Sequence, residues 1–310
     1  MSLSIATIIP TRNRPQDLAR CLRSLQAQRQ APDLVIVCDS SDAEETSVLC
    51  EKMAREDSGF CLRYLRSKSR GASIQRNLAI GVLPEDIDYV LLADDDVVFD
   101  PEYLALLSGV LSNDVARTIV GIAGVAQEER RLAPIWYRAY IRLFLLGNTR
   151  ACGKVLASGV NIAPALDGAC ADADWLFGCA LYRREVFTEV RFAEGLRGYS
   201  LYDDVDFSMY ARALGRLVVC PCALLDHRHS VLARPDEAAF AEMEIVNRYW
   251  LVRRHLPAIR NRLAYWWSVV GLLVIHGSRA ISRRSGGAQR WSGTLRGLGR
   301  VLQSKGRVLE

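Results

Sequence analysis

The stretch "YVLLADDDVVFD", residues 89–100, places three consecutive aspartates directly after a run of apolar residues. Adjacent carboxylates repel one another, so this arrangement costs stability unless a positive group lies among them. Carboxylate oxygens are hard ligands that suit Mg²⁺ or Mn²⁺, and these metals commonly bridge protein carboxylates and phosphate groups. The sequence therefore predicts a divalent-metal site at Asp94, Asp95 and Asp96. The alternative is a solvated turn whose acids cap the next helix.

Around this stretch, short apolar runs alternate with segments of helical periodicity. Strands are predicted at residues 4–9, 34–38, 61–65, 89–93 and 118–126, and helices from Pro15 and over 43–57, 72–82 and 101–112. Such alternation is typical of a mostly parallel, Rossmann-like central sheet that is flanked by helices. The sequence therefore predicts an α/β fold that binds its ligands at the carboxyl ends of the strands.

Three polar clusters follow predicted strands, at residues 10–13, 39–42 and 94–96. Because the carboxyl ends of parallel strands meet at one edge of a sheet, we expect these clusters to converge on one crevice. Side chains alternate between the two sides of extended backbone. Asp94 and Asp96 are therefore predicted to point to the same side, and Asp95 to point away.

A second acidic cluster, Asp203, Asp204 and Asp206, opens a predicted helix that ends at Gly215. A carboxylate that is aimed into a cleft from a helix start can act as a general base and deprotonate a hydroxyl group. Plain helix capping is the alternative. Further on, His227 follows an apolar strand and is either an imidazole ligand of a metal or a buried, hydrogen-bonded histidine.

These motifs, in this order, resemble family 2 glycosyltransferases of the GT-A fold, somewhat like the rhamnosyl- and galactofuranosyltransferase types. The similar segments are "IATIIPTRNRPQDLARCLRSLQAQ", "LVIVCDSSD", "RGASIQRNLAIG", "LLADDDVVFDPEYL", "DWLFGCALYRREVF" and "YDDVDFSMYARALG". They cover about residues 4–230. The resemblance implies an inverting hexosyl- or deoxyhexosyltransferase that depends on Mg²⁺ or Mn²⁺. It would move a sugar from a nucleotide-diphosphate sugar to a hydroxyl of a glycan or lipid-linked acceptor, in cell-envelope polysaccharide or glycolipid synthesis.

The resemblance also implies roles for individual residues. Nucleotide-sugar binding falls to Pro10, Thr11, Arg12, Arg14, Asp39, Arg76, Asp94 and Asp95, with Asp39 on the base and Arg76 near the diphosphate. The implied metal ligands are Asp96, Asp94 and His227; the catalytic acids are Asp204, as base, and Asp203; the acceptor contacts are Asp174, Trp175 and Gly178. Two departures stand out. The acid pair is Asp-Asp where Glu-Asp is common, and Asp39 is followed by Ser-Ser where Gly-Ser is common.

Two other classes of protein remain open at this point. A phosphatase of the haloacid dehalogenase type would use "LLADDDVV", but it needs a lysine after that motif, where only Lys154 and Lys305 occur. It would also leave the ninety N-terminal residues without a role. A non-catalytic nucleotide-sugar-binding protein would keep the binding residues and have no use for the base Asp204.

The C-terminal region differs in charge from the rest of the chain. Residues 245–310 hold thirteen Arg or Lys and one acid, whereas the preceding residues are acidic overall. We therefore expect a catalytic domain over 1–244 and a basic, amphipathic helical extension over 245–310, with no nucleic-acid partner. Trp250, Tyr265, Trp266 and Trp267 lie between arginines and an apolar block, a pattern typical of peripheral membrane contact. The alternatives are a helical hairpin packed on the catalytic domain and a homodimer contact.

The N-terminus, "MSLSIATIIPTRNR", lacks the features of a secretory signal, and no apolar run reaches the roughly 18 residues that span a bilayer. Nine scattered cysteines without a C-x-x-C pair are typical of reduced core thiols. We therefore expect a cytoplasmic protein that is peripheral on the cytoplasmic face of the inner membrane.

Overall fold

The computed structural model describes residues 3–56, 59–127, 133–148, 150–196, 199–228, 230, 235–282 and 285–304. The chain divides into two compact units, which we call the sheet unit and the helical unit. The sheet unit comprises Met1–Glu129 and Pro164–Ala233, and the helical unit comprises Arg130–Ala163 and Arg234–Glu310. Residues 130–163 thus group with the C-terminal helices, which the expected division at residue 244 did not anticipate.

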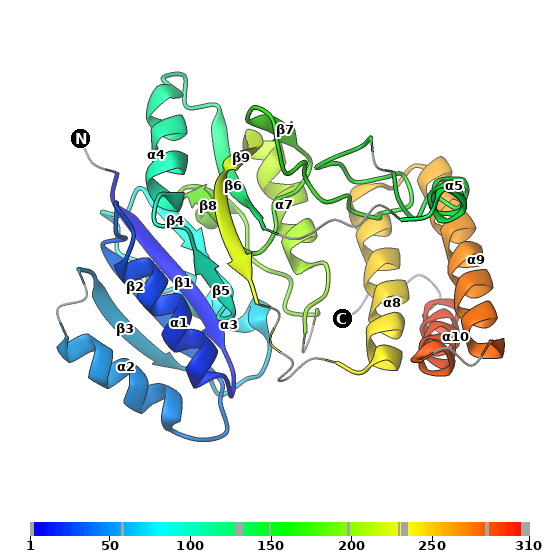
Figure 1. Ribbon diagram of the computed structural model, residues 1–310, viewed down its shortest axis with the longest axis horizontal. Helices are drawn as coiled ribbons and strands as arrows, with labels where there is room; N and C mark the ends of the chain where they lie inside the picture. The colour runs from blue at the N-terminus through cyan, green and yellow to red at the C-terminus, as the bar shows by residue number, and fades with distance from the viewer. Residues whose placement is uncertain are drawn as a thin grey trace. The chain divides into compact units, whose positions relative to one another are not determined.

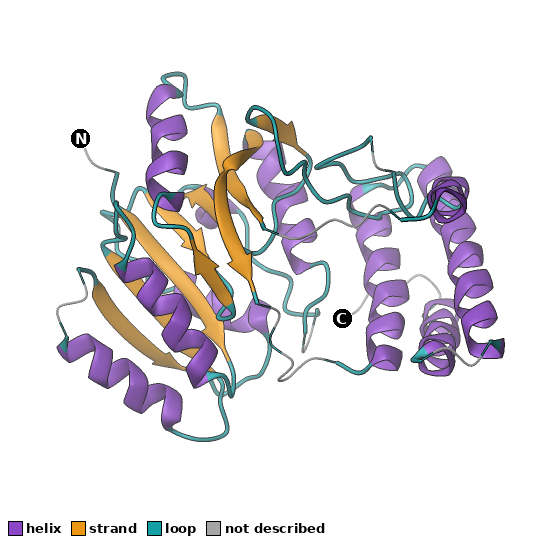
Figure 2. Ribbon diagram, viewed as in Figure 1, coloured by secondary structure: helices purple, strands orange, loops and turns teal. Residues whose placement is uncertain are grey.

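The sheet unit alternates strands and helices along most of its length (Figures 1 and 2). Its strands are β1 (Ile5–Thr11), β2 (Leu34–Asp39), β3 (Cys61–Arg66), β4 (Tyr89–Leu92), β5 (Val97–Phe99), β6 (Ile119–Ala126), β7 (Ala171–Ala173), β8 (Ala180–Arg183) and β9 (Arg216–His227). Its helices are α1 (Pro15–Gln26), α2 (Glu45–Arg55), α3 (Ala72–Ile80), α4 (Tyr103–Asn113), α6 (Val186–Glu189) and α7 (Asp203–Leu214). The five predicted strands are confirmed as β1, β2, β3, β4 and β6.

The strands form one sheet in the order β3-β2-β1-β4-β8-β6-β9-β5, with β7 paired to β9. The first four strands are parallel, and β6 is parallel to β9. Strand β8 runs antiparallel to both β4 and β6, while β5 and β7 run antiparallel to β9. The sheet is therefore mixed, and the prediction of a mostly parallel sheet holds only for its N-terminal half.

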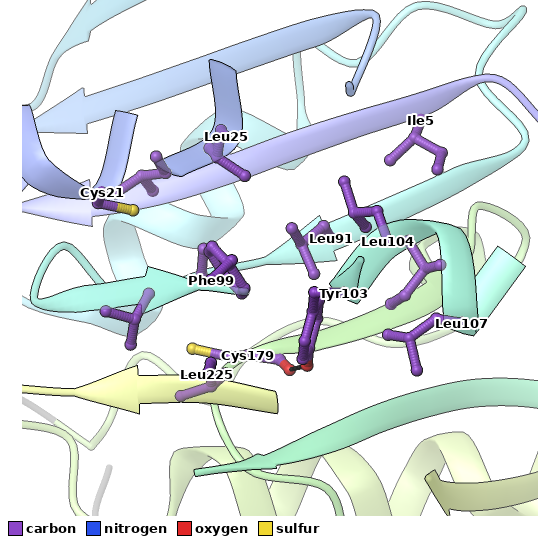
Figure 3. Packing of buried hydrophobic residues seen from close by; sticks show 14 of the residues in the cluster. Ile5, Cys21, Leu25, Leu91, Phe99, Tyr103, Leu104, Leu107, Cys179 and Leu225 are labelled. Atoms are coloured by element: carbon purple, nitrogen blue, oxygen red, sulfur yellow. Dashed lines mark hydrogen bonds between the residues drawn. The ribbon is translucent and has the colours of Figure 1, made fainter. Parts of the chain in front are cut away.

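Alternate residues of the strands supply two apolar cores, one on each face of the sheet. On one face, Ile5 and Ile9 of β1 pack with α1, α2 and α4, where Tyr103 is fully buried (Figure 3). The Tyr103 hydroxyl donates to the Cys179 carbonyl oxygen at 2.8 Å and accepts from the Gly124 N–H at 3.0 Å. On the other face, Ile8 packs with α3, α6 and α7. The two cores fix the sheet between two helical layers and so define its carboxyl edge.

Two cysteines depart from the expectation of reduced thiols. Cys170, just before β7, forms a disulfide with Cys220 of β9. This pairing lies beside the antiparallel contact of β7 with β9. The expectation that all nine thiols are free is therefore wrong for this pair.

The helical unit contains α5 (Ile135–Leu143), α8 (Glu237–His255), α9 (Ile259–Ile281) and α10 (Gly287–Gln303). Its core includes Ile245 and Val252 of α8, Tyr265 and Val269 of α9, and Val301 of α10. Among the described residues, no helix is both long enough and apolar enough to span a bilayer.

Candidate active site

The four parallel strands β1 to β4 place polar residues at one edge of the sheet, as the sequence predicts. Thr11 is the last residue of β1, Asp39 the last of β2 and Arg66 the last of β3. Asp94 follows β4 after one alanine. The strands are in register here, since Thr11 lies opposite Asp39, and Asp39 opposite Arg66.

Two of the three consecutive aspartates, Asp94 and Asp96, lie close to His227. The ligand atoms of Asp94, Asp96 and His227 all lie within 4.8 Å of one another. His227 Nε2 is 3.1 Å from Asp96 Oδ1, and the backbone N–H of Ser230 donates to Asp96 Oδ2 at 2.9 Å. Two carboxylates and an imidazole are suitable donors for a divalent cation such as Mg²⁺ or Mn²⁺. The residues present therefore fit the predicted metal site.

Asp95 has different contacts from its neighbours, but it lies with Asp96 in a turn after β4, so the predicted alternation of extended backbone does not apply here. Asp95 is buried, and its Oδ2 accepts from the Thr11 hydroxyl at 2.7 Å while its Oδ1 accepts from Arg14 Nη1 at 3.0 Å. The same Arg14 nitrogen lies 3.7 Å from Asp96 Oδ2. Arg14 is thus one positive group that offsets the repulsion among the consecutive aspartates. Its position follows from Pro15, which begins α1 immediately after it.

Asp96 is held in its ionised form. Burial disfavours the charge, but His227, the Ser230 N–H and Arg14 outweigh burial and lower the pKa of Asp96 to about 2. A metal ligand must be deprotonated to bind. Asp96 therefore meets this requirement throughout the physiological pH range.

A single buried guanidinium connects the two acidic clusters. Arg76 of α3 donates from Nη2 to Asp94 Oδ1 at 2.8 Å and from Nη1 to Asp203 Oδ2 at 2.6 Å. Its side chain is only 4% exposed, and it lies over the ring of Phe192. Asp94 and Asp203 are 109 residues apart in the sequence, and this contact places them at one site. The family resemblance implies a place for Arg76 near the diphosphate, and in this structure both of its terminal nitrogens contact carboxylates.

The acid pair lies in the first turn of α7, where the helix dipole favours negative charge. Asp203 is buried and also accepts from the Ser73 hydroxyl at 3.3 Å. Burial raises the pKa of Asp203, and Arg76 opposes that rise. Burial and the Asp203 carboxylate raise the pKa of Asp204 to about 7, although the Val205 N–H donates to its Oδ1 at 2.8 Å. Asp204 is therefore poised to take up a proton near neutral pH.

The loops that follow β1 and β2 are tied to each other. The Asn13 amide donates to Asp42 Oδ2 at 2.9 Å, and the Asp42 N–H donates back to Asn13 Oδ1 at 2.8 Å. Asn13 has a φ of 55°, a conformation that asparagine tolerates better than most residues. Arg12, expected in the nucleotide pocket with Pro10, pairs with Asp42 at 3.2 Å and is partly exposed.

Asp39 occupies a different environment from the one expected for a contact to the base. Its side chain is fully buried. It accepts hydrogen bonds from the Ser41 N–H at 2.7 Å and from the Tyr64 hydroxyl and Arg66 Nη1, both at 2.9 Å. In this structure Asp39 organises the end of β2, and the partly exposed Arg66 lies beside it. The contact of Asp39 with a base stays a prediction.

The three residues expected at the acceptor lie in different surroundings. Asp174 pairs with Arg212 of α7 at 2.9 Å, and Trp175 is buried. Gly178 lies directly against the metal cluster, because a Cβ built at this position would be 2.9 Å from Asp94 Oδ2. Gly178 thus leaves room for the Asp94 carboxylate. Its role toward an acceptor stays a prediction.

Sequence reasoning missed several residues that support the site. Gln75 Nε2 donates to the carbonyl oxygens of Thr11, at 2.8 Å, and of Cys38, and so joins the ends of β1 and β2. Ser73 contacts Asp203, and Ser230 contacts Asp96. Ser73 and Gln75 lie in "RGASIQRNLAIG", from which only Arg76 was selected. The signal for Ser73 and Gln75 was their place in that segment.

A sequence model of the family described as glycosyl transferase family 2 matches residues 6–191, which is more than half of the chain. The chain belongs to glycosyl transferase family 2. The match covers the three aspartates, Arg76 and Gly178. No curated protein matches the sequence significantly.

Solved structures show the GT-A fold of this family 2 glycosyltransferase. The mannosyltransferase PcManGT from Pyrobaculum calidifontis, in complex with GDP-Man and Mn²⁺, has a TM-score of 0.60 at 12% identity, covering 99% of this chain and 88% of its own. GalNAc-T7 with UDP, GalNAc and Mn²⁺ has a TM-score of 0.59 at 14% identity, and the match covers 81% of this chain and 48% of GalNAc-T7. S. aureus TarS 1-349 has a TM-score of 0.55 at 14% identity, and the match covers 91% of this chain and 75% of TarS 1-349.

Proposed function

We propose that this family 2 glycosyltransferase transfers a sugar, with inversion, from a nucleotide-diphosphate sugar to a hydroxyl group of a glycan or lipid-linked acceptor. The observation that carries the proposal is the contact of Arg76 with both Asp94 and Asp203. It places a cluster suited to a cation beside an acid suited to proton abstraction. Transfer of a sugar to a hydroxyl needs both functions at one place.

The donor end of the site is the cluster at the carboxyl edge of the sheet. Asp94, Asp96 and His227 would hold Mg²⁺ or Mn²⁺, and the bound cation would neutralise the charge of the diphosphate. Arg14 adds positive charge there, since it contacts both Asp95 and Asp96. Thr11 and Arg14 fix the Asp95 side chain, which is therefore preorganised to accept from a hydroxyl of the nucleotide sugar. The proposal of metal-bridged diphosphate binding agrees with the GDP-Man and Mn²⁺ named for PcManGT.

The acceptor end is the start of α7. Of the two acids, Asp204 is the better candidate for the base, because Asp203 is engaged by Arg76 and Ser73. A pKa near 7 suits a general base at neutral pH. Asp204 would remove the acceptor proton as the acceptor oxygen attacks the anomeric carbon from the face opposite the leaving diphosphate. One displacement of this kind inverts the configuration and forms no covalent bond to the enzyme.

The two alternatives account for fewer observations. The phosphatase would leave the N-terminal residues without a role. The family match begins at residue 6 and so gives the N-terminal strands a role. A non-catalytic binding protein would gain nothing from a carboxylate whose pKa is raised to about 7. Catalytic transfer therefore remains the proposal.

We also propose that the enzyme acts at the cytoplasmic face of the inner membrane, in cell-envelope polysaccharide or glycolipid synthesis, with peripheral contact through the C-terminal region. The strong excess of basic residues over 245–310 supports this location.

The test is a screen of UDP-, GDP- and dTDP-linked sugars for thermal stabilisation of the full chain, with Mn²⁺, with Mg²⁺ and with a chelator. A donor is expected to raise Tm only when a divalent cation is present, and D96N is expected to abolish the shift. The matched control is D172N, which removes an exposed acid of β7. Stabilisation that is unchanged by the chelator, or equal in D96N and in the control, would refute the donor site.

A further inference from the structure

The exposed side of α9 is apolar along most of its length. Leu263 is 62% exposed, Trp267 45%, Val270 43%, Val274 52% and Ile281 86%. These positions are separated by four, three, four and seven residues, which places them on one face of a helix. Exposed apolar side chains are common singly, but a continuous row marks an interaction surface.

The buried side of the same helix carries polar groups. Asn261, Ser268 and His276 are buried in the helical unit. The Ser268 hydroxyl donates to the Tyr265 carbonyl oxygen at 2.6 Å, and His276 Nδ1 lies 2.8 Å from the Thr294 hydroxyl of α10. The same side also contributes Tyr265 and other apolar residues to the core of the helical unit, so α9 is apolar on its outward side as well as on its packed side. A helix that contacted only its own unit and water would be polar on the outward side.

Helix α5 of the same unit also exposes apolar residues. Ile135 is 83% exposed, Trp136 60% and Leu143 63%, and the helix has no buried residue. It is joined to α9 directly, because Trp267 Nε1 donates to the Leu143 carbonyl oxygen at 2.7 Å and the ring of Phe144 stacks on that of Trp267. Both helices belong to the helical unit (Figure 1). We call the exposed apolar residues of α5 and α9 the apolar face.

The charges next to the apolar face are positive. Helix α9 contains no acidic residue, and Arg260 and Arg262 are exposed in its first turns. Arg253 and Arg254 are exposed at the end of α8, a few residues earlier in the chain. A second copy of this chain on the same face would bring these arginines together with their counterparts, which costs energy. An anionic lipid surface offers the opposite charge, together with an apolar interior.

We propose that the apolar face of α5 and α9 inserts into the surface of a bilayer that contains anionic lipid, with Arg260 and Arg262 at the level of the headgroups. This inference deepens the proposed function, since it assigns the expected membrane contact to a defined surface. It also changes the residues involved. Trp250 and Tyr265, which suggested membrane contact in the sequence, are buried, whereas α5 lies outside residues 245–310 altogether.

The experiment measures binding of the full chain to vesicles by flotation. One set of vesicles contains phosphatidylcholine with phosphatidylglycerol, and the other contains phosphatidylcholine alone. We expect binding to the first set that is weakened by salt, and much weaker binding to the second. The variant V270Q/V274Q is expected to bind roughly tenfold more weakly. The matched control V48Q/V115Q replaces two exposed valines of the sheet unit and is expected to bind as the parent chain does.

The basic residues form a second arm of the test. R260Q/R262Q is expected to lose roughly fivefold in binding for each arginine on anionic vesicles, and much less on neutral ones. Circular dichroism and release of nucleoside diphosphate in the absence of vesicles establish that each variant is folded and active. Because vesicle binding needs neither donor nor acceptor, an inactive protein that still floats contradicts the proposed function and leaves this inference intact.

Two results would overturn the inference. One is equal flotation of V270Q/V274Q and of V48Q/V115Q. The other is a parent chain that is dimeric in solution and becomes monomeric in V270Q/V274Q, with vesicle binding unchanged. The second result would assign the apolar face to contact between two copies of the chain.

Discussion

Replacing Asp204 by asparagine tests both its chemical role and the cost of holding it in place. Burial and the Asp203 carboxylate raise the pKa of Asp204 from its ordinary 3.8 to about 7. Below pH 3.8 the group is neutral in the folded and unfolded chains, so it costs nothing. Between pH 3.8 and 7 the unfolded chain releases this proton and the folded chain keeps it, so stability falls as pH rises. Above pH 7 the cost is complete.

The size of this cost follows from the pKa shift. A shift of about three units corresponds to a cost on the order of 4 kcal/mol at pH 8. D204N removes the charge and is therefore expected to raise the Tm of the sheet unit at pH 8 by on the order of 10 °C. At pH 4 the gain should nearly vanish. The same variant is expected to lower kcat by about 10²–10⁴-fold, which is the usual contribution of a general base.

The assay combines thermal unfolding from pH 4 to pH 8, in the presence of a chelator, with measurement of nucleoside diphosphate release at saturating Mn²⁺. D172N is the control, and its effect on stability should stay within about 1 kcal/mol, because the side chain is exposed. The kcat of the parent enzyme should rise with pH through about 7. A D204N gain that is equal at pH 4 and pH 8 would refute the electrostatic reasoning. A D204N enzyme with undiminished kcat would remove Asp204 from the base position.

Three further substitutions have definite expected outcomes. R76K is expected to lower kcat by at least tenfold, because a lysine ammonium group cannot contact Asp94 and Asp203 at the same time, as the guanidinium does. A kcat equal to that of the parent enzyme would contradict the role of Arg76 in joining the two acids. G178A is expected to weaken Mn²⁺ binding by about 10–100-fold in calorimetric titration, because the added Cβ would displace the Asp94 carboxylate. An unchanged affinity for Mn²⁺ would contradict the role of Asp94 as a ligand. Arg248 is fully buried, and its three guanidinium nitrogens have no hydrogen-bond partner among the residues that the structure describes. R248M is therefore expected to leave the Tm of the helical unit unchanged or to raise it. If R248M instead lowers Tm, and phosphate stabilises the parent chain, Arg248 binds an anion.

Local sequence pattern was enough to predict the parallel half of the sheet and the side of α1 that packs on it. Ile5 to Ile9 alternate between the two faces of the sheet, and Leu18, Leu22 and Leu25 occupy one side of α1, as their spacing indicates. These features depend on contacts within a strand or a helical turn, where periodicity is informative.

The remaining features depend on contacts between distant residues, which periodicity does not encode. Strand β8 inserts between β4 and β6 in the antiparallel direction, and nothing in its four residues specifies that pairing. Asp39 looks like an exposed acid after a strand, but Tyr64 and Arg66 cover its carboxylate. The exposure of the apolar face likewise follows from which side of α9 packs on α8 and α10.

The balance of charge at the site explains why the three consecutive aspartates are tolerated. Five carboxylates, of Asp94–Asp96 and Asp203–Asp204, lie around two guanidinium groups, those of Arg14 and Arg76. Each guanidinium contacts two carboxylates, so carboxylates outnumber guanidinium groups at the site. Burial and the Asp203 carboxylate raise the pKa of Asp204 to about 7, and burial raises the pKa of Asp95 to about 7 although Arg14 contacts it. At the cluster of Asp94, Asp96 and His227, Arg76 contacts Asp94 at 2.8 Å and Arg14 lies 3.7 Å from Asp96, but each guanidinium is shared with a further carboxylate. A divalent cation held there would supply further positive charge, so that a diphosphate donor could bind where the carboxylates alone would repel it. We therefore expect metal binding and donor binding to be coupled by electrostatics, with the repulsion among the aspartates as the reason that the cation is needed.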